Sequence, residues 1–174
     1  MAKADLGISG ARVVIGIDPG LQATGFAVLE VGGSTLKLLE FGDIKTSPKQ
    51  ALCERLGTIF TGLEGVMERW HPHAMVLEKL YSNYSFPNTA IVMGHVRGVI
   101  CLAAYRANAE LMEVAATEAK RALTGYGRAS KEQMAASISR LLGLKDIPKS
   151  EHTADALALA TVGAFRVTSP MARR

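Results

Sequence analysis

RVVIGIDPG, residues 12–20, is an apolar run that ends in a carboxylate and a turn. Its apolar part is rich in β-branched residues, which is typical of a strand that is buried on both faces of a sheet. The sequence Asp18-Pro19-Gly20 predicts a turn directly after this strand. Because α/β proteins build their sites at strand ends, Asp18 is the first candidate site residue.

Four further strands are expected downstream of this run. Short runs rich in β-branched and apolar residues, bounded by turn residues, predict them. The third strand of the chain is rather polar and is therefore expected at an edge of the sheet. The predicted strands cover residues 24–31, 35–44, 74–77 and 111–115.

Helices are expected after the third strand and between the later ones. Ser47-Pro48 predicts a helix start, with Ser as N-cap and Pro at the first helical position, and Pro72 ends that helix. Thr117 is expected to cap a short helix that runs through Leu123. Ser130 and Gln133 predict a capping box for the next helix, which Gly143 terminates. The other predicted helices cover residues 88–108 and 151–165.

The predicted order of elements is βββαβαβαα. It indicates an α/β fold with a mixed five-stranded sheet and helices on both faces. We expect one domain over residues 12–166, with a flexible leader over residues 1–11 and a flexible tail over residues 167–174. The chain contains no internal repeat and no low-complexity tract that would indicate a second domain.

Composition limits the compartment and the partners. The net charge of +4 permits nucleic-acid binding without requiring it. Cys53 and Cys101 lack the spacing of a metal or redox motif and are expected to be buried free thiols in a reducing compartment. The longest apolar stretch, residues 90–105, is interrupted by His95 and Arg97, so no membrane span is expected. These features predict a cytoplasmic protein.

Two pairs of residues carry the candidate chemistry. Asp18 and Glu78 each follow a buried apolar strand, so their carboxylates converge if the two strands are neighbours. His152 and Asp155 are spaced i, i+3 at the front of an alanine-rich helix and share one face. Capping of the helix start explains Glu151 well and Asp155 less well. Together the two pairs fit a site for two Mg²⁺ or Mn²⁺ ions that hydrolyses a phosphodiester.

Several motifs, in one order, resemble a known family, the RuvC-type Holliday-junction resolvases of the ribonuclease H-like superfamily. The resemblance covers roughly residues 13–165. The motifs are IGIDPG (15–20) with Thr24-Gly25, VLE (76–78), GHVRG (94–98), Lys120 with residues 125–131, and HTADALALA (152–160).

The resemblance implies an endonuclease of DNA recombination and repair. It implies a homodimer that binds a four-way DNA junction and nicks two opposing strands symmetrically, together with the RuvA and RuvB branch-migration proteins. It implies that Lys120 and Lys131 lie near the scissile phosphate and that Tyr81 stacks on an unpaired base. It also implies the metal-binding catalytic set Asp18, Glu78, His152 and Asp155.

The resemblance includes two departures and leaves alternatives open. His152 stands where many members carry Asp, and Tyr81 stands where Phe is frequent. Without the resemblance, Lys120 and Lys131 could equally be charged residues on the solvated faces of helices. Arg97 could be either an interface or a surface residue. One rival is a ribonuclease H-like nuclease that acts on RNA or an RNA–DNA hybrid. The other is an actin-like ATP-binding fold, which needs a second lobe that 174 residues do not supply.

Overall fold

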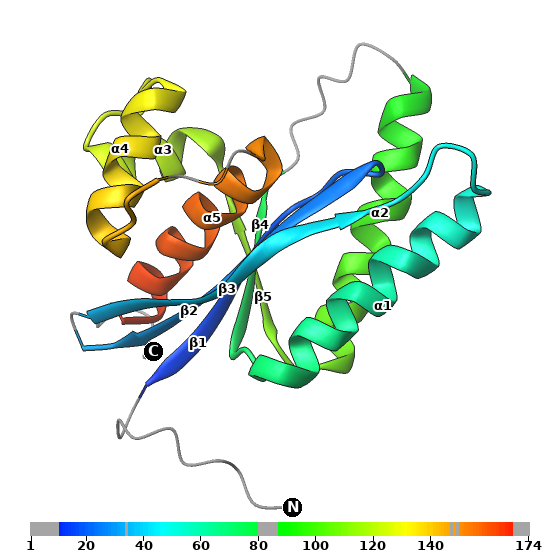
Figure 1. Ribbon diagram of the computed structural model, residues 1–174, viewed down its shortest axis with the longest axis horizontal. Helices are drawn as coiled ribbons and strands as arrows, with labels where there is room; N and C mark the ends of the chain where they lie inside the picture. Colours follow the sequence, from blue (N-terminus) through cyan, green and yellow to red (C-terminus); the bar gives the residue numbers. More distant parts are fainter. Residues whose placement is uncertain (1–10, 34, 80–86, 147, 149, 169–174) are drawn as a thin grey trace, which may run out of the picture.

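The computed structural model describes residues 11–33, 35–79, 87–146, 148 and 150–168 (Figure 1). Residues 1–10 of the predicted leader, Tyr81 and residues 169–174 lie outside this part of the chain. The strands form one five-stranded sheet in the order β3-β2-β1-β4-β5. Their bounds are β1 Arg12–Asp18, β2 Ala23–Gly32, β3 Thr35–Lys45, β4 Ala74–Glu78 and β5 Glu110–Val114.

The sheet is mixed, as predicted. β1 pairs antiparallel with β2, and β2 with β3, whereas β1 pairs parallel with β4, and β4 with β5. The rather polar third strand is at an edge, which confirms its predicted place. The parallel pairing of β1 and β4 is what aligns their carboxyl ends at one edge of the sheet.

Helices cover both faces of the sheet (Figure 1). Two of them, α1 and α2, lie against one face, and the other three lie on the opposite side. Three helices follow β5, so the described order is βββαβαβααα. Each of these three helices was predicted, and the predicted order βββαβαβαα was wrong only in leaving one of them out. The helices are α1 Leu52–Trp70, α2 Pro87–Arg106, α3 Ala116–Thr124, α4 Lys131–Leu142 and α5 Glu151–Thr168.

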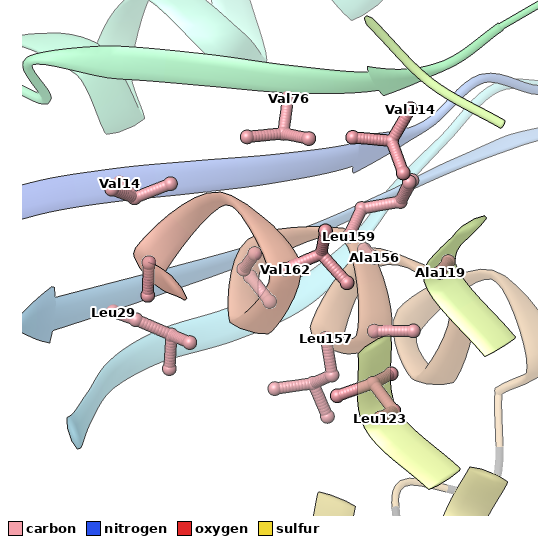
Figure 2. Close-up of a cluster of buried hydrophobic side chains, with 14 of the residues drawn as sticks. Val14, Leu29, Val76, Val114, Ala119, Leu123, Ala156, Leu157, Leu159 and Val162 are labelled. Carbon is pink, nitrogen blue, oxygen red and sulfur yellow. The ribbon is translucent and has the colours of Figure 1, made fainter. Parts of the chain in front are cut away.

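Side chains of β1 point alternately to the two faces of the sheet, and each face has its own hydrophobic core. Val13, Ile15 and Ile17 pack with the α1 and α2 side, while Val14 belongs to the cluster around α5. Figure 2 shows the second cluster, in which side chains of the sheet meet those of α5 and α3. Because side chains alternate along a strand, Asp18 is in phase with Val14 and faces the α5 side.

Close contacts through glycine set the position of α5 on the sheet. A Cβ added at Gly16 would stand 2.2 Å from the backbone oxygen of Ala156. One added at Gly25 would stand 2.1 Å from the backbone oxygen of His152, and one at Gly163 would stand 2.4 Å from Cγ2 of Val76. These distances leave no room for a side chain. The first turn of α5 is therefore held at a fixed height above β1 and β2.

Helix boundaries differ from the predictions for α1, α2, α3 and α5; α2 ends at Arg106 rather than at residue 108. α1 begins at Leu52 rather than at Ser47-Pro48, because Ser47 and Gln50 bond each other in a turn and Glu54 instead accepts from the N–H of Ala51. Thr117 lies inside α3, whose N-cap is Ala115. α5 continues through Thr168, so its last residues belong to the helix rather than to the predicted tail.

The remaining expectations have mixed outcomes. The capping box of Ser130 with Gln133 and the helix end at Gly143 are confirmed. Cys53 is exposed and Cys101 partly exposed, so the expectation of two buried thiols was wrong. None of the helices among the described residues has both the length and the apolar character to cross a membrane.

Candidate active site

Asp18 and Glu78 lie beside each other at the carboxyl ends of β1 and β4. The two strands are parallel neighbours, and Ile17 is in register with Leu77. The next residue of each strand is the carboxylate, and both are in phase with side chains that face α5. The convergence that the strand ends predicted is confirmed by this register.

The first turn of α5, which lies over this edge of the sheet, adds two side chains to the pair of carboxylates. Nδ1 of His152 lies 2.6 Å from Oδ2 of Asp18. Asp155, one turn further along α5, lines a pocket together with Glu78. The four residues of the predicted catalytic set therefore meet at one place, and they come from three elements, β1, β4 and α5.

Burial and mutual repulsion make this cluster unfavourable for negative charge. Burial raises the pKa of Asp18 to about 6; contact with His152 opposes the shift, and the charges of Asp155 and Glu78 add to it. Burial and the charge of Asp155 also raise the pKa of Glu78. The pKa of Asp155 is raised by burial in its pocket, against the opposing charge of Lys131. A cation placed among these carboxylates would relieve both effects.

The donor set fits a hard divalent cation, although it is not arranged as a finished metal site. Three carboxylates and one imidazole are ligands that Mg²⁺ and Mn²⁺ accept. Over the described ranges, no three of the His, Cys, Asp and Glu side chains are grouped closely enough to hold an ion as they stand. In this arrangement His152 contacts Asp18 directly. Joint binding of a metal would need these side chains to turn toward a common point.

Two lysines border the carboxylates. Lys120 from α3 and Lys131 from α4 line, with Glu78 and Asp155, a pocket of about 320 Å³ between α3, α4 and α5. Nζ of Lys131 lies 3.2 Å from Oε1 of Glu151, and both side chains are largely exposed. The positive groups expected near a phosphate thus stand next to the carboxylates. The predicted stacking residue, Tyr81, lies outside the described residues.

Arg97 is a site residue that sequence reasoning missed. It is buried in α2, so it is not a surface residue. Its Nη1 donates to the backbone oxygen of Glu78 at 2.7 Å, and its Nη2 donates to the carboxylate of Glu113 at 2.5 Å. Arg97 therefore holds the end of β4 where the candidate ligand stands. An arginine in the middle of an apolar helix was the available signal.

Asp43 is a second residue that sequence reasoning missed, and no local pattern indicated its role. Its Oδ1 accepts hydrogen bonds from the hydroxyl of Ser150 at 2.8 Å and from that of Thr153 at 2.7 Å. Both hydroxyls belong to the start of α5, on either side of Glu151 and His152. Asp43 thus ties the edge strand β3 to the turn that carries the imidazole.

The fold and this cluster define a nuclease of the ribonuclease H-like class, with carboxylates at the ends of two parallel strands and lysines beside them. The family model described as "Crossover junction endodeoxyribonuclease RuvC" matches residues 14–163. The chain belongs to this family, whose members are metal-dependent nucleases. The predicted enzyme class is thereby confirmed, and the actin-like alternative was wrong.

Relatives of the same description cover nearly the whole chain. The protein from Rhodopirellula baltica is 41% identical over 161 residues, which are 92% of this chain and 90% of that protein. The one from Heliobacterium modesticaldum is 40% identical over 162 residues, covering 93% of this chain and 99% of its own.

Solved structures agree with this assignment. "T. thermophilus RuvC in complex with Holliday junction substrate" matches with a TM-score of 0.85 and 35% identity, over 90% of this chain and 94% of that one. The yeast mitochondrial Holliday junction resolvase matches with a TM-score of 0.60 at 13% identity, over 92% of this chain and 79% of that one. At that identity the second match supports the fold alone.

Proposed function

We propose that this protein binds four-way (Holliday) DNA junctions and resolves them by paired symmetric nicks, in DNA recombination and repair. The observation that carries the proposal is the meeting of Asp18, Glu78, His152 and Asp155 beside two lysines. It is supported by the structural match to a RuvC protein that holds a Holliday junction substrate.

We infer that two divalent cations, Mg²⁺ or Mn²⁺, bind to this carboxylate and imidazole set. When bound, they would activate a water molecule and stabilise the leaving oxygen of the phosphodiester. Asp18 and Glu78 would hold them from the sheet, and His152 and Asp155 from the helix. The raised pKa of Asp18, to about 6, supports this inference, because a buried carboxylate gains most from a nearby cation.

The lysines of the pocket would act on the substrate rather than on the metals. Lys120 and Lys131 border the carboxylates, so a phosphate held at the metals would lie within reach of their ammonium groups. Pairing of Lys131 with the exposed Glu151 is weak in water and would yield to a phosphate. Tyr81 is proposed to stack on an unpaired base of the junction.

Paired cutting requires two sites, and a homodimer with two-fold symmetry would supply them. The helix α2 carries large apolar side chains that are exposed in the single chain: Ile91 is 59% exposed, Leu102 50% and Tyr105 79%. This face is our candidate for the contact between two copies. RuvA and RuvB are the proposed further partners, as the family resemblance implies.

A substrate comparison tests the proposal. The protein is incubated with a four-way DNA junction, a linear DNA duplex and an RNA–DNA hybrid of the same sequence, each with Mg²⁺ or Mn²⁺. We expect paired nicks in the junction and little cutting of the duplex. The Asp18→Asn variant serves as the control, and it should bind the junction without cutting it. Faster cutting of the hybrid than of the junction would favour the RNA-directed alternative.

A further inference from the structure

One row of residues runs across the sheet beneath the first turn of α5. Asp18 of β1 is in register with Gly25 of β2, and Gly25 is in register with Asp43 of β3. The backbone of His152 lies directly on Gly25, where an added Cβ would be 2.1 Å from its oxygen. Asp43 and Asp18 therefore stand on either side of the point where α5 touches the sheet.

Asp43 contacts this turn from the side opposite Asp18. Its Oδ1 accepts the hydroxyl hydrogens of Ser150 and Thr153, at 2.8 and 2.7 Å. Thr153 is almost fully buried, with 2% of its surface exposed. The Oγ of Ser150 also accepts from the N–H of Thr153 at 3.3 Å, as an N-cap residue does. One carboxylate oxygen thus holds both the cap and the third residue of the helix.

We propose that Asp43 is a positioning residue, which fixes the first turn of α5 and thereby sets the distance of His152 and Asp155 from Asp18 and Glu78. The inference rests on the proposed metal-binding role of those four residues. Since each metal would be shared between the sheet and the helix, a small shift of the helix start separates its ligands. Outer partners that orient metal ligands change metal affinity or activity by about 10–100-fold when they are removed.

Two variants of Asp43 distinguish a positioning role from an effect of its negative charge. Asp43→Asn keeps the oxygen that accepts both hydroxyls but removes the charge, whereas Asp43→Ala removes both. We expect Asp43→Asn to bind Mn²⁺ within about threefold of the unaltered protein, and Asp43→Ala to bind it roughly tenfold or more weakly. Mn²⁺ binding is measured by titration calorimetry on the DNA-free protein, with thermal unfolding recorded for every variant.

A carboxylate three residues earlier on the same strand provides the matched control. Glu40 of β3 accepts hydrogen bonds from Arg69 and Trp70 of α1, on the other face of the sheet. Glu40→Ala removes a comparable polar link between β3 and a helix, so it should lower thermal stability while leaving the Mn²⁺ affinity unchanged. A general loss of stability is thereby distinguished from a loss of ligand position.

A variant in α5 tests the same hydrogen bond if Asp43→Ala folds poorly. Thr153→Val replaces the buried hydroxyl by a methyl group of similar size and should also weaken Mn²⁺ binding. Combined with Asp43→Ala, it should add little further loss, because both changes remove the same bond. Unaltered Mn²⁺ affinity in Asp43→Ala or in Thr153→Val would overturn the proposal, as would equal losses in Asp43→Asn and Asp43→Ala. Failure of the unaltered protein to bind Mn²⁺ would instead refute the metal site itself.

Discussion

Oδ2 of Asp18 lies 2.6 Å from Nδ1 of His152, although the two residues are 134 positions apart. The contact joins the first strand of the sheet to the first turn of the last helix. It places an imidazole against a carboxylate that is already poorly solvated, and the raised pKa of Asp18, about 6, reflects that burial.

Asp18 should destabilise the metal-free protein near neutral pH. Its pKa is raised from 3.8 to about 6 on folding, so the folded state binds the proton more tightly than the unfolded state. The contribution to stability is complete below about 3.8 and is lost as pH rises through about 6. Asp18→Asn should therefore raise the free energy of unfolding at pH 7.5 by roughly 1–3 kcal/mol, with the gain disappearing near pH 4. Urea unfolding of both proteins at pH 4 and pH 7.5, with a chelator present, measures this difference in the free energy of unfolding.

Glu40 provides a control for the predicted direction of the pH dependence of stability at Asp18. The pKa of Glu40 is lowered by its bonds to Arg69 and Trp70, although its partial burial opposes them. The contribution of Glu40 to the stability of the folded protein is present above its ordinary pKa and is lost as pH falls. Glu40→Gln should therefore lower the free energy of unfolding most at neutral pH. Identical pH dependence for the Asp18 and Glu40 variants would contradict the assignment.

Gly25→Ala should disrupt the site without removing any functional group. An added Cβ would stand 2.1 Å from the backbone oxygen of His152, and backbone cannot rotate away as a side chain can. We expect displacement of the start of α5 and a loss of cleavage of about 100-fold or more. Gly57→Ala is the control, because an added Cβ there meets nothing within 4 Å and should stabilise α1 by about 0.5–1 kcal/mol. Normal cleavage by Gly25→Ala would show that the helix start tolerates movement.

Lys120→Ala and Lys131→Ala should lower the cleavage rate more than the affinity for the junction. If the two lysines lie at the scissile phosphate, each stabilises charge that develops during cleavage, and its loss should slow the single-turnover rate by about 100-fold. Binding should fall steeply with KCl in every variant, because phosphate contacts release counterions. Arg140→Ala is the control, because Arg140 is exposed in the last turn of α4. Equal losses in rate and affinity would indicate ordinary backbone contacts instead.

Arg97→Met should lower the free energy of unfolding by about 2 kcal/mol, because it removes charged hydrogen bonds to the Glu78 carbonyl and to Glu113. It should also lower cleavage, since the end of β4 that carries Glu78 loses its anchor. Arg106→Met on the same helix is the matched control. Its side chain is 62% exposed, pairs with Glu64 and lies over the ring of Phe60, so its loss should cost no more than about 1 kcal/mol. Urea unfolding of both variants provides the comparison, and equal effects would argue against an anchoring role.

If the proposed homodimer forms through α2, Leu102→Glu combined with Tyr105→Glu should convert it to monomers. These side chains are 50% and 79% exposed on α2, and a charge there would be desolvated in a contact between two copies. The variant should give single nicks in place of paired ones, with its sedimentation coefficient reduced to that of one chain. Phe41→Glu on the edge strand β3 should leave assembly unchanged. An unaltered protein that sediments as a stable monomer at micromolar concentration and still cuts junctions would refute the dimer.

Local pattern predicted the strands and helices and indicated the candidate site residues. The β-branched run of residues 12–17 predicted a buried strand, and both carboxylates at the predicted strand ends lie beside each other. The capping box at Ser130 defined the start of α4 because its hydrogen bonds span only three residues. The start of α1 was misplaced, since Ser47 and Gln50 can satisfy each other in a turn as readily as in a helix.

The fold class, the family and the candidate site residues could be predicted from the sequence, because each rests on patterns of residues that are close along the chain. Only the tertiary structure decided how those side chains are held. The contact of Asp18 with His152, the Arg97 bond to Glu78 and the Asp43 bonds to Ser150 and Thr153 join segments far apart in sequence. They depend on the register of the strands and on how closely α5 approaches Gly16 and Gly25, and these are properties of packing that no local pattern specifies.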